Sequence, residues 1–545
     1  MAPICAHLRR KRFVLILSIL IFLPMGGALL VGLFPQARVS RTLSFLVSLV
    51  TFVFSLALYG GFDLSDGGFQ FKEQFDLVAN LGIHYSVGID GLSLWLILLS
   101  TFITPLVILG SLSAIEKNVR GFFASVLLLE ASVIGTLAST DIFLFYLFWE
   151  LMLIPAFFLI GVWGGPNRVR ATIKFVLFTM LGSLLLLVAL IYVIHEVKSF
   201  EYAKLFDHFF PEDVQFWCFL AFGLAFFIKV PLFPFHAWLP DAYTEAPAGG
   251  TVLLSAVMVK LGAYGLLRFC IPLFPNAAKD FAPWIMALAV LGVIHGALMA
   301  SIQTDFKRLM AYSSLSHMGL ILLGLFTFSL TGLQGGLLQM ISHGVYMAGL
   351  FLLIGMLYER RKSNEMDAFG GIAKVLPVLS TAFLWLMVAA VGIPGFAGFP
   401  GEILILVSAY KISPLLALIS IAGFVLSAWY MFNFYGKVFL GPIKGQPQDT
   451  RSSRKSSGEK NLDKNFEGSR NLEDLRWHEW LAVLPLAAAV LWIGLTPNFF
   501  LRPMEKSLQL GVIEKLKPPP VMTDFAARER RNQIEKEIEK EKKHR

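Results

Sequence analysis

Four ionisable residues stand inside long apolar stretches of the sequence. Glu150 lies within IFLFYLFWELMLIPAFF, Lys229 within AFGLAFFIKVPLFPF and Lys260 within VLLSAVMVKLGAYGLL, and Glu402 ends the segment GIPGFAGFPGE. A charge at the centre of a membrane helix costs at least about 2.5–3.5 kcal/mol, so it is seldom there without a role. Burial favours the neutral form of a lysine, whereas a nearby carboxylate favours the charged form. Residues of these two types can therefore exchange a proton, and we regard the four as candidates for a proton relay.

A structural role for the same residues is the main alternative. Each one could be half of a buried ion pair that holds two helices together. No neighbour in sequence can neutralise Glu150, Lys229 or Lys260, so their partners must come from other helices or from water. Four residues of both signs on four separate spans favour a polar axis across the bundle. The scaffold alternative predicts instead that uncharged substitutions of matched size affect assembly and not transport.

Three histidines occupy successive apolar spans that lie in sequence between Lys260 and Glu402. They are His295 in VLGVIHGALMAS, His317 in AYSSLSHMGLIL and His343 in LLQMISHGVYMAGLF. A single histidine in a membrane more often makes a hydrogen bond between helices, but three on neighbouring helices could bridge the two charges. Simpler roles, in shaping a helix break or in reaching toward the lipid headgroups, remain for His236, Lys174 and Lys307.

The apolar stretch around Lys229 predicts a helix that is broken inside the membrane. Pro231 and Pro234 follow the lysine, and each lacks an N–H and obstructs the carbonyl four residues earlier. The affected carbonyls belong to Phe227 and Val230. Unpaired carbonyls at this depth persist only where protein or a water-filled cavity satisfies them. We therefore expect the break to lie in a polar or tightly packed surrounding.

A second break is predicted just before Glu402, where Pro394 and Pro400 stand among several glycines. The segments 233–240 and 395–402 resemble one another loosely, and five spans separate them. An odd number of spans reverses the direction of the chain across the membrane. The sequence therefore suggests an inverted repeat, which is the arrangement of many ion-coupled transporters.

Composition identifies an integral membrane protein. Hydrophobic residues make up 56% of the 545 residues, charged residues 15%, and the mean hydropathy is +0.69. A soluble domain carries about a quarter charged residues. Apolar stretches of about twenty residues, long enough to cross a bilayer, recur along the chain. We expect about fourteen spans, at 13–34, 42–60, 91–114, 120–139, 141–164, 172–196, 213–244, 250–273, 282–302, 307–328, 332–358, 375–411, 413–440 and 478–501.

Charge distribution and missing motifs exclude several functions. The net charge is +9, but basic residues lie in short runs between apolar segments and in the polar regions 442–477 and 515–545. This is how a membrane protein sets its topology, so nucleic-acid binding is not expected. Cys5, Cys218 and Cys270 are far apart and form no disulfide, metal or iron–sulfur pattern. The sequence contains no GxxxxGK[ST] loop, no GxGxxG fingerprint and no CxxCH motif.

The loops predict an orientation. Those on one side are basic, whereas the loops 61–90 and 196–213 on the other side are acidic. We place the basic loops in the cytoplasm and both chain ends outside, although the basic run 9–12 argues for the reverse. The basic residues are Arg38, Arg41, Lys117, Arg120, Arg168, Arg170, Lys174, Lys307, Arg308, Arg360, Arg361 and Lys362.

Several quoted segments resemble a known family. DIFLFYLFWELMLIPAFFLIGVWGG, FPFHAWLPDAYTEAPAGGTVLLSAVMVKLGAYGLLRF, DFKRLMAYSSLSHMGLILLG and ISHGVYMAGLFLLIGMLYERR look like the antiporter-like membrane subunits of complex I, the NADH:quinone oxidoreductase. The resemblance covers about residues 80–440. It implies an all-α membrane protein of fourteen transmembrane helices, with two inverted five-helix repeats that each contain a broken helix. The family is similar to the large subunits of multi-component cation/proton antiporters.

The resemblance also implies roles for individual residues. Glu150 would pair with Lys229 and modulate its affinity for protons, and Lys260 would form the central relay. His317 and His343 would continue the relay, and Glu402 would pass protons toward the exit. Glutamate at this last position is typical of one subunit of the family, whereas its sister subunits and the antiporter proteins carry lysine.

The resemblance divides the chain and implies its surroundings. This subunit would bind no cofactor or metal, and NADH, FMN, iron–sulfur clusters and quinone would belong to partner subunits. Its neighbours would be sister antiporter-like subunits and lipids in the bacterial inner membrane. Rival assignments are a sodium/proton antiporter subunit and the equivalent subunit of a ferredoxin-driven photosynthetic complex or a membrane-bound hydrogenase. The expected regions are 1–119 with an extramembrane hairpin at 61–90, a first repeat at 120–273, a second at 282–440, a polar loop at 441–477, a last span at 478–501 and a charged tail at 502–545.

Overall fold

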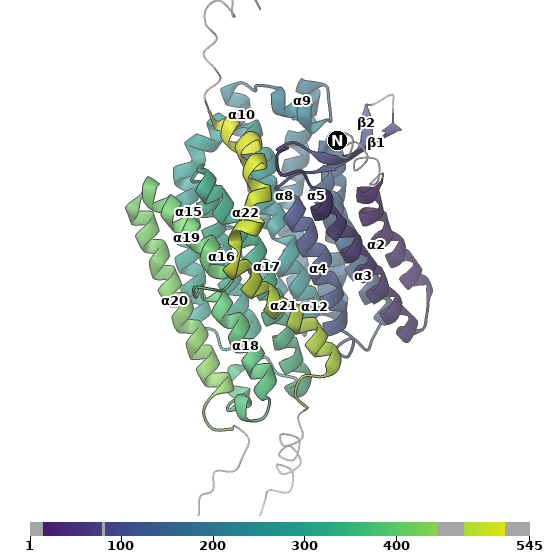
Figure 1. Cartoon of the computed structure of the whole chain (residues 1–545), viewed down its shortest axis with the longest axis vertical. Coiled ribbons are helices and arrows are strands. Elements are labelled where there is room, and N and C mark those ends of the chain that lie inside the picture. The colour runs from purple at the N-terminus through teal and green to yellow at the C-terminus, as the bar shows by residue number, and fades with distance from the viewer. Residues whose placement is uncertain (1–14, 79–81, 444–472, 518–545) are drawn as a thin grey trace, which may run out of the picture.

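The computed structural model describes residues 15–78, 82–443 and 473–517. Most helices run between two ends of one bundle, and a small β-hairpin covers one of these ends (Figure 1). In the described ranges ten helical spans are long and apolar enough to cross a membrane, and α4 and α18 are shorter apolar helices. Three helices that bear buried polar groups, α10, α16 and α19, do not reach this measure. The predicted all-α membrane architecture is thus confirmed.

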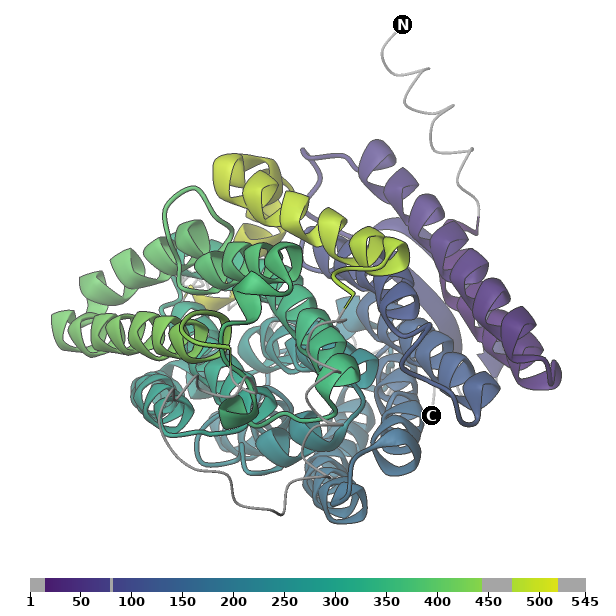
Figure 2. The same ribbon diagram turned by 90° about the horizontal axis from the view of Figure 1, so that it is seen from below.

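The N-terminal unit consists of α2 (Ile16–Leu33), α3 (Ala37–Gly61) and α4 (Leu94–Gly110), and Figure 2 shows α2 and α3 at one side of the bundle. The buried face of α3 carries mainly hydroxyls, which bond to carbonyls of their own helix and allow close packing. These residues are Ser40, Ser44, Ser48, Thr51 and Ser55.

The hairpin predicted at 61–90 is present. Strands β1 (Gln70–Val78) and β2 (Ile83–Ile89) pair antiparallel. Buried Glu73 on β1 accepts hydrogen bonds from the backbone N–H groups of Leu17, at 2.7 Å, and Ser18, at 3.0 Å. These donors at the start of α2 have no partner within their own helix. The hairpin therefore holds the beginning of the first membrane helix.

The first repeat begins at α5 (Val119–Ala138) and ends with a helix over 248–273. Between them lie α6 (Ile142–Leu151), α7 (Leu153–Trp163), α8 (Arg168–Val197), the short α9 (Tyr202–Asp207), α10 (Glu212–Lys229) and α11 (Trp238–Glu245). The closing helix is made of α12 (Ala248–Leu253), α13 (Lys260–Gly265) and α14 (Ile271–Leu273), joined by π-helical turns at Leu254–Met258 and Leu266–Cys270.

The second repeat consists of α15 (Pro275–Ser301), α16 (Phe306–Leu325), α17 (Leu330–Arg361), α18 (Pro377–Ala390), α19 (Gly398–Ile412) and α20 (Pro414–Phe439). Two short 3-10 turns, Met366–Ala368 and Ile372–Lys374, connect α17 to α18. Helix α20 forms an outer edge of the bundle, opposite α2 and α3 (Figure 1).

Hydrogen bonds show that the two repeats are related by inversion. A β-bridge joins Asp141 to Glu201 at the hairpin end, and an equivalent bridge joins Asp305 to Glu365 at the other end. Both bridges connect the same number of residues, and each aspartate side chain accepts backbone bonds at the start of α6 or α16. Two further backbone bonds of the first repeat have counterparts with equal spacing in the second. The bond from Ile142 N to Phe200 O corresponds to the bond from Phe306 N to Asn364 O. The bond from Tyr202 N to Thr140 O corresponds to the bond from Met366 N to Thr304 O.

Loops with basic residues gather at the end opposite the hairpin. Arg41 donates to the carbonyl of Ile115, and the indole of Trp163 donates to that of Lys117. Lys307 likewise donates to the carbonyl of Thr244. These bonds join the start of α3 and the end of α7 to the α4–α5 connection, and the start of α16 to the end of α11, all at this end of the bundle. We call it the basic end.

The C-terminal region differs from the expected last span at 478–501 and the tail from 502. Helix α21 (Trp477–Leu495) ends early, because Pro497 begins a second helix, α22 (Pro497–Leu508), which continues through a π turn at Gln509–Ile513 into α23 (Glu514–Leu516). This segment packs along the bundle toward the hairpin end (Figure 1). The indole of Trp95 donates to the carbonyl of Phe500 at 2.9 Å. Expectations for 444–472 and 518–545 fall outside the described residues.

Candidate functional site

The first helix break lies directly after Lys229, as predicted. Helix α10 ends at this lysine. The carbonyl of Phe227 accepts a bond from the N–H of Leu232 at 2.8 Å, and the carbonyl of Ile228 accepts one from the indole of Trp238 at 2.9 Å. Protein groups thus satisfy carbonyls that the break frees at membrane depth. Both predicted prolines, Pro231 and Pro234, lie in the break.

Lys229 is buried, with only 2% of its surface exposed. Its Nζ has no hydrogen-bond partner in the described ranges and lies 4.8 Å from the ring centre of Trp149. Glu150, which follows Trp149 in the sequence, lies one residue before the end of α6, and its carboxylate interacts electrostatically with Lys229. The structure therefore places the predicted pair near each other. Among the described residues the two form no direct ion pair; Lys229 contacts the ring of Trp149, and Glu150 acts on it electrostatically.

Lys260 begins α13, between two π-helical turns. Only 1% of its surface is exposed. Its Nζ donates to the carbonyl of Ser255, five residues earlier, and lies 2.6 Å from Nδ1 of His343 on α17. π-Helical turns frequently occur at functional positions. Here the widened turn supplies a carbonyl that fixes the lysine on the side that faces His343.

A chain of polar side chains continues from His343 to Glu402. The ring centres of His343 and His317 are 5.7 Å apart, and Nδ1 of His317 lies 3.5 Å from Oε1 of Glu402. The amide of Gln339 donates to the same carboxylate oxygen at 3.0 Å. All of these side chains are buried. The structure thus connects Lys260 to Glu402 through two of the three predicted histidines.

Gln339 was not among the residues singled out from the sequence. It lies one helical turn before His343 on α17, so the two side chains share one face of the helix. This spacing was visible in LLQMISHG, but an uncharged amide gave no reason to select it. The hydrogen bond that its amide donates orients the Glu402 carboxylate.

The second break separates α18 from α19. Gly392 and Gly395 have φ angles of +77° and +92°, which favour glycine. A Cβ at Gly392 would overlap the carboxylate of Glu402, so a side chain there would require that carboxylate to move. Pro394 lies in this break, as predicted. Pro400 differs from the prediction, because it lies in the first turn of α19, where a missing N–H costs no helical bond.

His295 does not join this chain of side chains. Its ring lies 4.9 Å from that of His236 and 5.1 Å from that of Phe233, both in the first break. Helix α15 therefore contributes a contact to the break, in agreement with the simpler role expected of His236.

Lys174 and Lys307, for which simple roles were expected, have different surroundings. Lys174 is partly exposed and forms an ion pair with Asp241 at 2.7 Å. Lys307 is buried and donates to the carbonyls of Thr244, at 2.9 Å, and Ala246, at 2.5 Å. The expectation that Lys307 extends toward the lipid headgroups was wrong. Carbonyls at the end of α11 lack partners in their own helix and bind its ammonium group instead.

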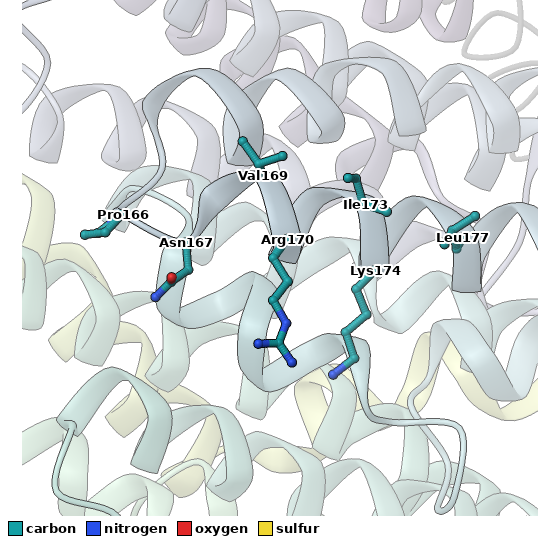
Figure 3. Close-up of a pocket in the computed structure, with 7 residues that line it drawn as sticks. All are labelled: Pro166, Asn167, Val169, Arg170, Ile173, Lys174 and Leu177. Atoms are coloured by element: carbon teal, nitrogen blue, oxygen red, sulfur yellow. The ribbon is translucent and has the colours of Figure 1, made fainter.

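An open groove runs along the first turns of α8 at the basic end (Figure 3). The side chains of Arg170 and Lys174 point in the same direction in this view. None of the buried relay candidates lines it. The lining residues are Pro166, Asn167, Val169, Arg170, Ile173, Lys174 and Leu177.

Two further buried ionic features were missed. Arg268 forms a bidentate pair with Asp90, at 2.8 and 2.6 Å, where β2 leads into α4. Glu130 on α5 is 1% exposed, and neither of its carboxylate oxygens has a hydrogen-bond partner in the described ranges. The criterion that selected Glu150, a charge inside an apolar stretch, would also have selected Glu130 in VLLLEASVIG.

Potential metal ligands are scattered through the bundle. Within the described ranges no cluster of three or more histidine, cysteine, aspartate or glutamate side chains could hold a metal ion. Cys218 and Cys270 are buried free thiols, and Cys5 lies outside the described residues.

These features define a class of protein. A helical bundle of two inverted units, each broken near a buried ionisable side chain, is the architecture of ion-coupled membrane transporters. Comparison with known families agrees. Residues 139–428 match the model described as NADH:quinone oxidoreductase/Mrp antiporter, TM, and residues 16–136 match NADH-ubiquinone oxidoreductase chain 4, amino terminus. The chain belongs to the NADH:quinone oxidoreductase/Mrp antiporter family of membrane subunits.

Individual relatives narrow this result. NADH-quinone oxidoreductase subunit M of Rickettsia prowazekii is 36% identical over 504 residues, which cover 91% of this chain and 98% of the relative. NADH-ubiquinone oxidoreductase chain 4 of Marchantia polymorpha is 36% identical over 495 residues, 90% of this chain and 96% of the relative. These relatives support the subunit M/chain 4 branch of the family.

Solved structures show the same pattern. A chain of respiratory complex I from Thermus thermophilus superposes with a TM-score of 0.81 and 34% identity, covering 92% of this chain and 100% of that chain. A chain of the Mrp complex from Dietzia has a TM-score of 0.78 but only 21% identity, covering 93% of this chain and 99% of that one. The second likeness concerns the fold alone.

Proposed function

We propose that this chain is a proton-translocating subunit of the membrane arm of a complex I-type NADH:quinone oxidoreductase. Quinone reduction elsewhere in the complex would drive protons through its buried side chains. The observation that carries this proposal is the buried series Lys260, His343, His317 and Glu402, in which each member approaches the next. A series of this kind has little value for simple packing, because intramembrane ionisable groups are costly.

Proton movement in this series can be assigned to atoms. The carbonyl of Ser255 only accepts, so the hydrogen bond between Lys260 and that carbonyl uses one N–H of the lysine. A charged Lys260 also donates to Nδ1 of His343, and after the proton moves the imidazole donates to the neutral amine. Nε2 of His343 and Nε2 of His317 have no partner in the described part of the chain. Each imidazole can therefore accept or release a proton at that atom.

The two ends of the series have different surroundings. At Glu402 the amide of Gln339 holds one carboxylate oxygen, and that oxygen faces His317. At the first break Glu150 favours the charged form of Lys229. A change in the distance between Glu150 and Lys229 would therefore release or rebind a proton, which links a conformational change to proton occupancy. We assign Glu150 and Lys229 to this control and Glu402 to the exit.

The remaining expectations follow from membership in such a complex. We expect NADH, FMN, iron–sulfur clusters and quinone to bind to partner subunits, and sister antiporter-like subunits to lie on either side. The bacterial inner membrane fits the bacterial relatives, and the gathering of basic loops at one end supports a cytoplasmic basic end. Both chain ends would then lie on the outer side.

The test is NADH-driven proton pumping in membrane vesicles that carry Lys229→Ala or Glu150→Gln in the assembled complex. We expect pumping to be lost while the amount of complex stays normal. Lys204→Ala, at a lysine side chain 61% exposed, is the control for loss of a positive charge. Undiminished proton stoichiometry in Lys229→Ala would contradict the proposal. Failure of both variants to assemble would favour the scaffold alternative.

A further inference from the structure

Glu130 is a buried acid that the proposed route does not use. It lies near the middle of α5, is 1% exposed, and no cation among the described residues interacts with it. Two other carboxylates on the membrane helices have neighbours that favour the charged form, Lys229 for Glu150 and the donating amide of Gln339 for Glu402. An isolated carboxylate is the most costly form of such a group. The surroundings therefore favour an uncharged acid.

One polar side chain approaches Glu130 but does not neutralise it. The hydroxyl of Thr104 on α4 lies near Glu130, yet neither carboxylate oxygen has a hydrogen-bond partner in the described ranges. That hydroxyl donates its hydrogen to the carbonyl of Ser100 at 2.9 Å. Burial without a cation is therefore the feature that favours the uncharged acid.

Helix α5 connects this acid to the proposed route. It packs against α6, which carries Glu150, and against the helix of Lys260. Tyr264, one turn after Lys260, donates to the carbonyl of Leu137 on α5 at 3.0 Å. Glu130 and Lys260 precede this contact on two helices that run in the same direction, by about 10 Å and about 6 Å of helix respectively. The two groups therefore lie at similar depth in the membrane on touching helices.

We propose that Glu130 is a further proton-carrying residue of the translocation machinery, and that its loading with a proton is coupled to the charge on Lys260. The acid form holds one proton on a carboxylate oxygen. When the O–H bond breaks, the proton leaves, the electron pair stays on the carboxylate, and the local charge falls from zero to minus one. A negative charge on α5 attracts a proton to Lys260, and its neutralisation releases that proton. This inference rests on the proposed function.

The experiment compares Glu130→Gln with Glu130→Asp in the complete complex. Glutamine keeps the shape of the side chain but cannot titrate, whereas aspartate can. We expect Glu130→Gln to assemble normally and to lower NADH-driven proton pumping several-fold, and Glu130→Asp to retain most of it. Ser132→Ala is the matched control on the same helix, because Ser132 is buried and its hydroxyl donates to the carbonyl of Leu128 within that helix.

Pumping by Glu130→Gln at the level of the parent would overturn the inference and leave Glu130 with a purely structural role. If that result accompanied lost pumping in Lys229→Ala, the proposed function would stand and only the role of Glu130 would fail. Normal pumping in both Glu130→Gln and Lys229→Ala would contradict the inference and the proposed function together. Infrared spectra of the purified complex give a second readout. A carboxylic acid C=O band that disappears in Glu130→Gln is expected, and an unchanged band would show that Glu130 is ionised and would overturn the inference.

Discussion

Nζ of Lys260 lies 2.6 Å from Nδ1 of His343, so a single hydrogen bond joins the last helix of the first repeat to α17 of the second. Both partners are buried, and either atom can hold the shared proton. Under the proposed function, this contact is the point at which protons pass between the two inverted units.

Removal of either partner should stop proton transfer. We expect Lys260→Met and His343→Gln to lower the rate of NADH-driven proton pumping by about a hundredfold, which is within the range of a lost acid–base group. NADH oxidation by an artificial acceptor should stay normal, because we propose that the electron path lies in other subunits. The control is Ser342→Ala, a buried neighbour whose Oγ has no partner in the described ranges. Equal pumping in His343→Gln and the control would contradict the route.

Gly392 should be intolerant of a side chain for two separable reasons. Its φ of +77° strains any other residue by about 1–2 kcal/mol, and a Cβ would displace the carboxylate of Glu402. Gly395 has a similar φ, +92°, but a Cβ added there would meet nothing within 4 Å. We expect Gly392→Ala and Gly395→Ala to lower thermal stability alike, and only Gly392→Ala to lower pumping further. Equal pumping in both would contradict a role for the position of Glu402.

The Asp90–Arg268 pair should be essential for folding. Arg268 is also stacked against the rings of Phe69, Tyr264 and Tyr202, at 4.8, 5.2 and 5.5 Å. Removal of one member of a buried pair costs about 3–5 kcal/mol. We therefore expect Arg268→Gln to reduce the amount of assembled complex, as judged on native gels.

A partly exposed pair provides the comparison for Arg268. The side chain of Arg308 is 40% exposed and lies 3.4 Å from Asp241. An ion pair of this kind contributes about 0–1 kcal/mol, so Arg308→Gln should assemble normally. Similar losses of assembled complex in both variants would show that burial of the Arg268 pair has no special importance.

Asp141 should make stability depend on pH. This residue precedes α6 at the hairpin end, outside the span itself. Burial raises the pKa of its carboxyl from 3.8 to about 6, although backbone N–H groups of Leu144 and Phe143 oppose the shift. Between these two values the folded chain holds a proton that the unfolded chain has lost. The free energy of unfolding therefore falls as the pH rises through this interval.

Asp141→Asn tests this effect, because asparagine keeps an oxygen that can accept from the backbone but has no charge. We expect the free energy of unfolding of the variant not to fall over this pH interval, and the variant to be more stable than the parent above about pH 6. Thermal unfolding in detergent, measured across this interval and above it, gives the comparison. Superimposable profiles of parent and variant would contradict the assignment to Asp141.

Much of the architecture could be predicted because the membrane restricts it. Apolar length located the helices, and prolines located the break after Lys229. The partner of each freed group could not be predicted. The carbonyl of Ile228 is satisfied by Trp238, and the ammonium of Lys307 by carbonyls ending α11. Such partners are set by how the chain turns after the break, which hydropathy does not encode.

The candidate site was predicted unevenly for a related reason. Charges inside apolar stretches were easy to recognise, so Lys260 and Glu402 were selected. Gln339, an uncharged link, was not, and His295 was grouped with two histidines that it does not contact. The sequence gives the order of the helices but not the direction in which each side chain points. The packing of α15 against α16 decides that His295 points toward His236.

The inverted bridges of Asp141 and Asp305 have a consequence for the direction of transport. Equivalent bridges close the two five-helix units at opposite faces, so these bonds favour neither direction across the membrane. The halves differ elsewhere. Helices α10 and α18 both stop at a break, but the first ends in Lys229 and the second in Ala390, and π-helical turns interrupt the last helix of the first unit whereas α20 is continuous. Under the proposed function, the direction of pumping would therefore be set by these local differences and not by the shared bridges.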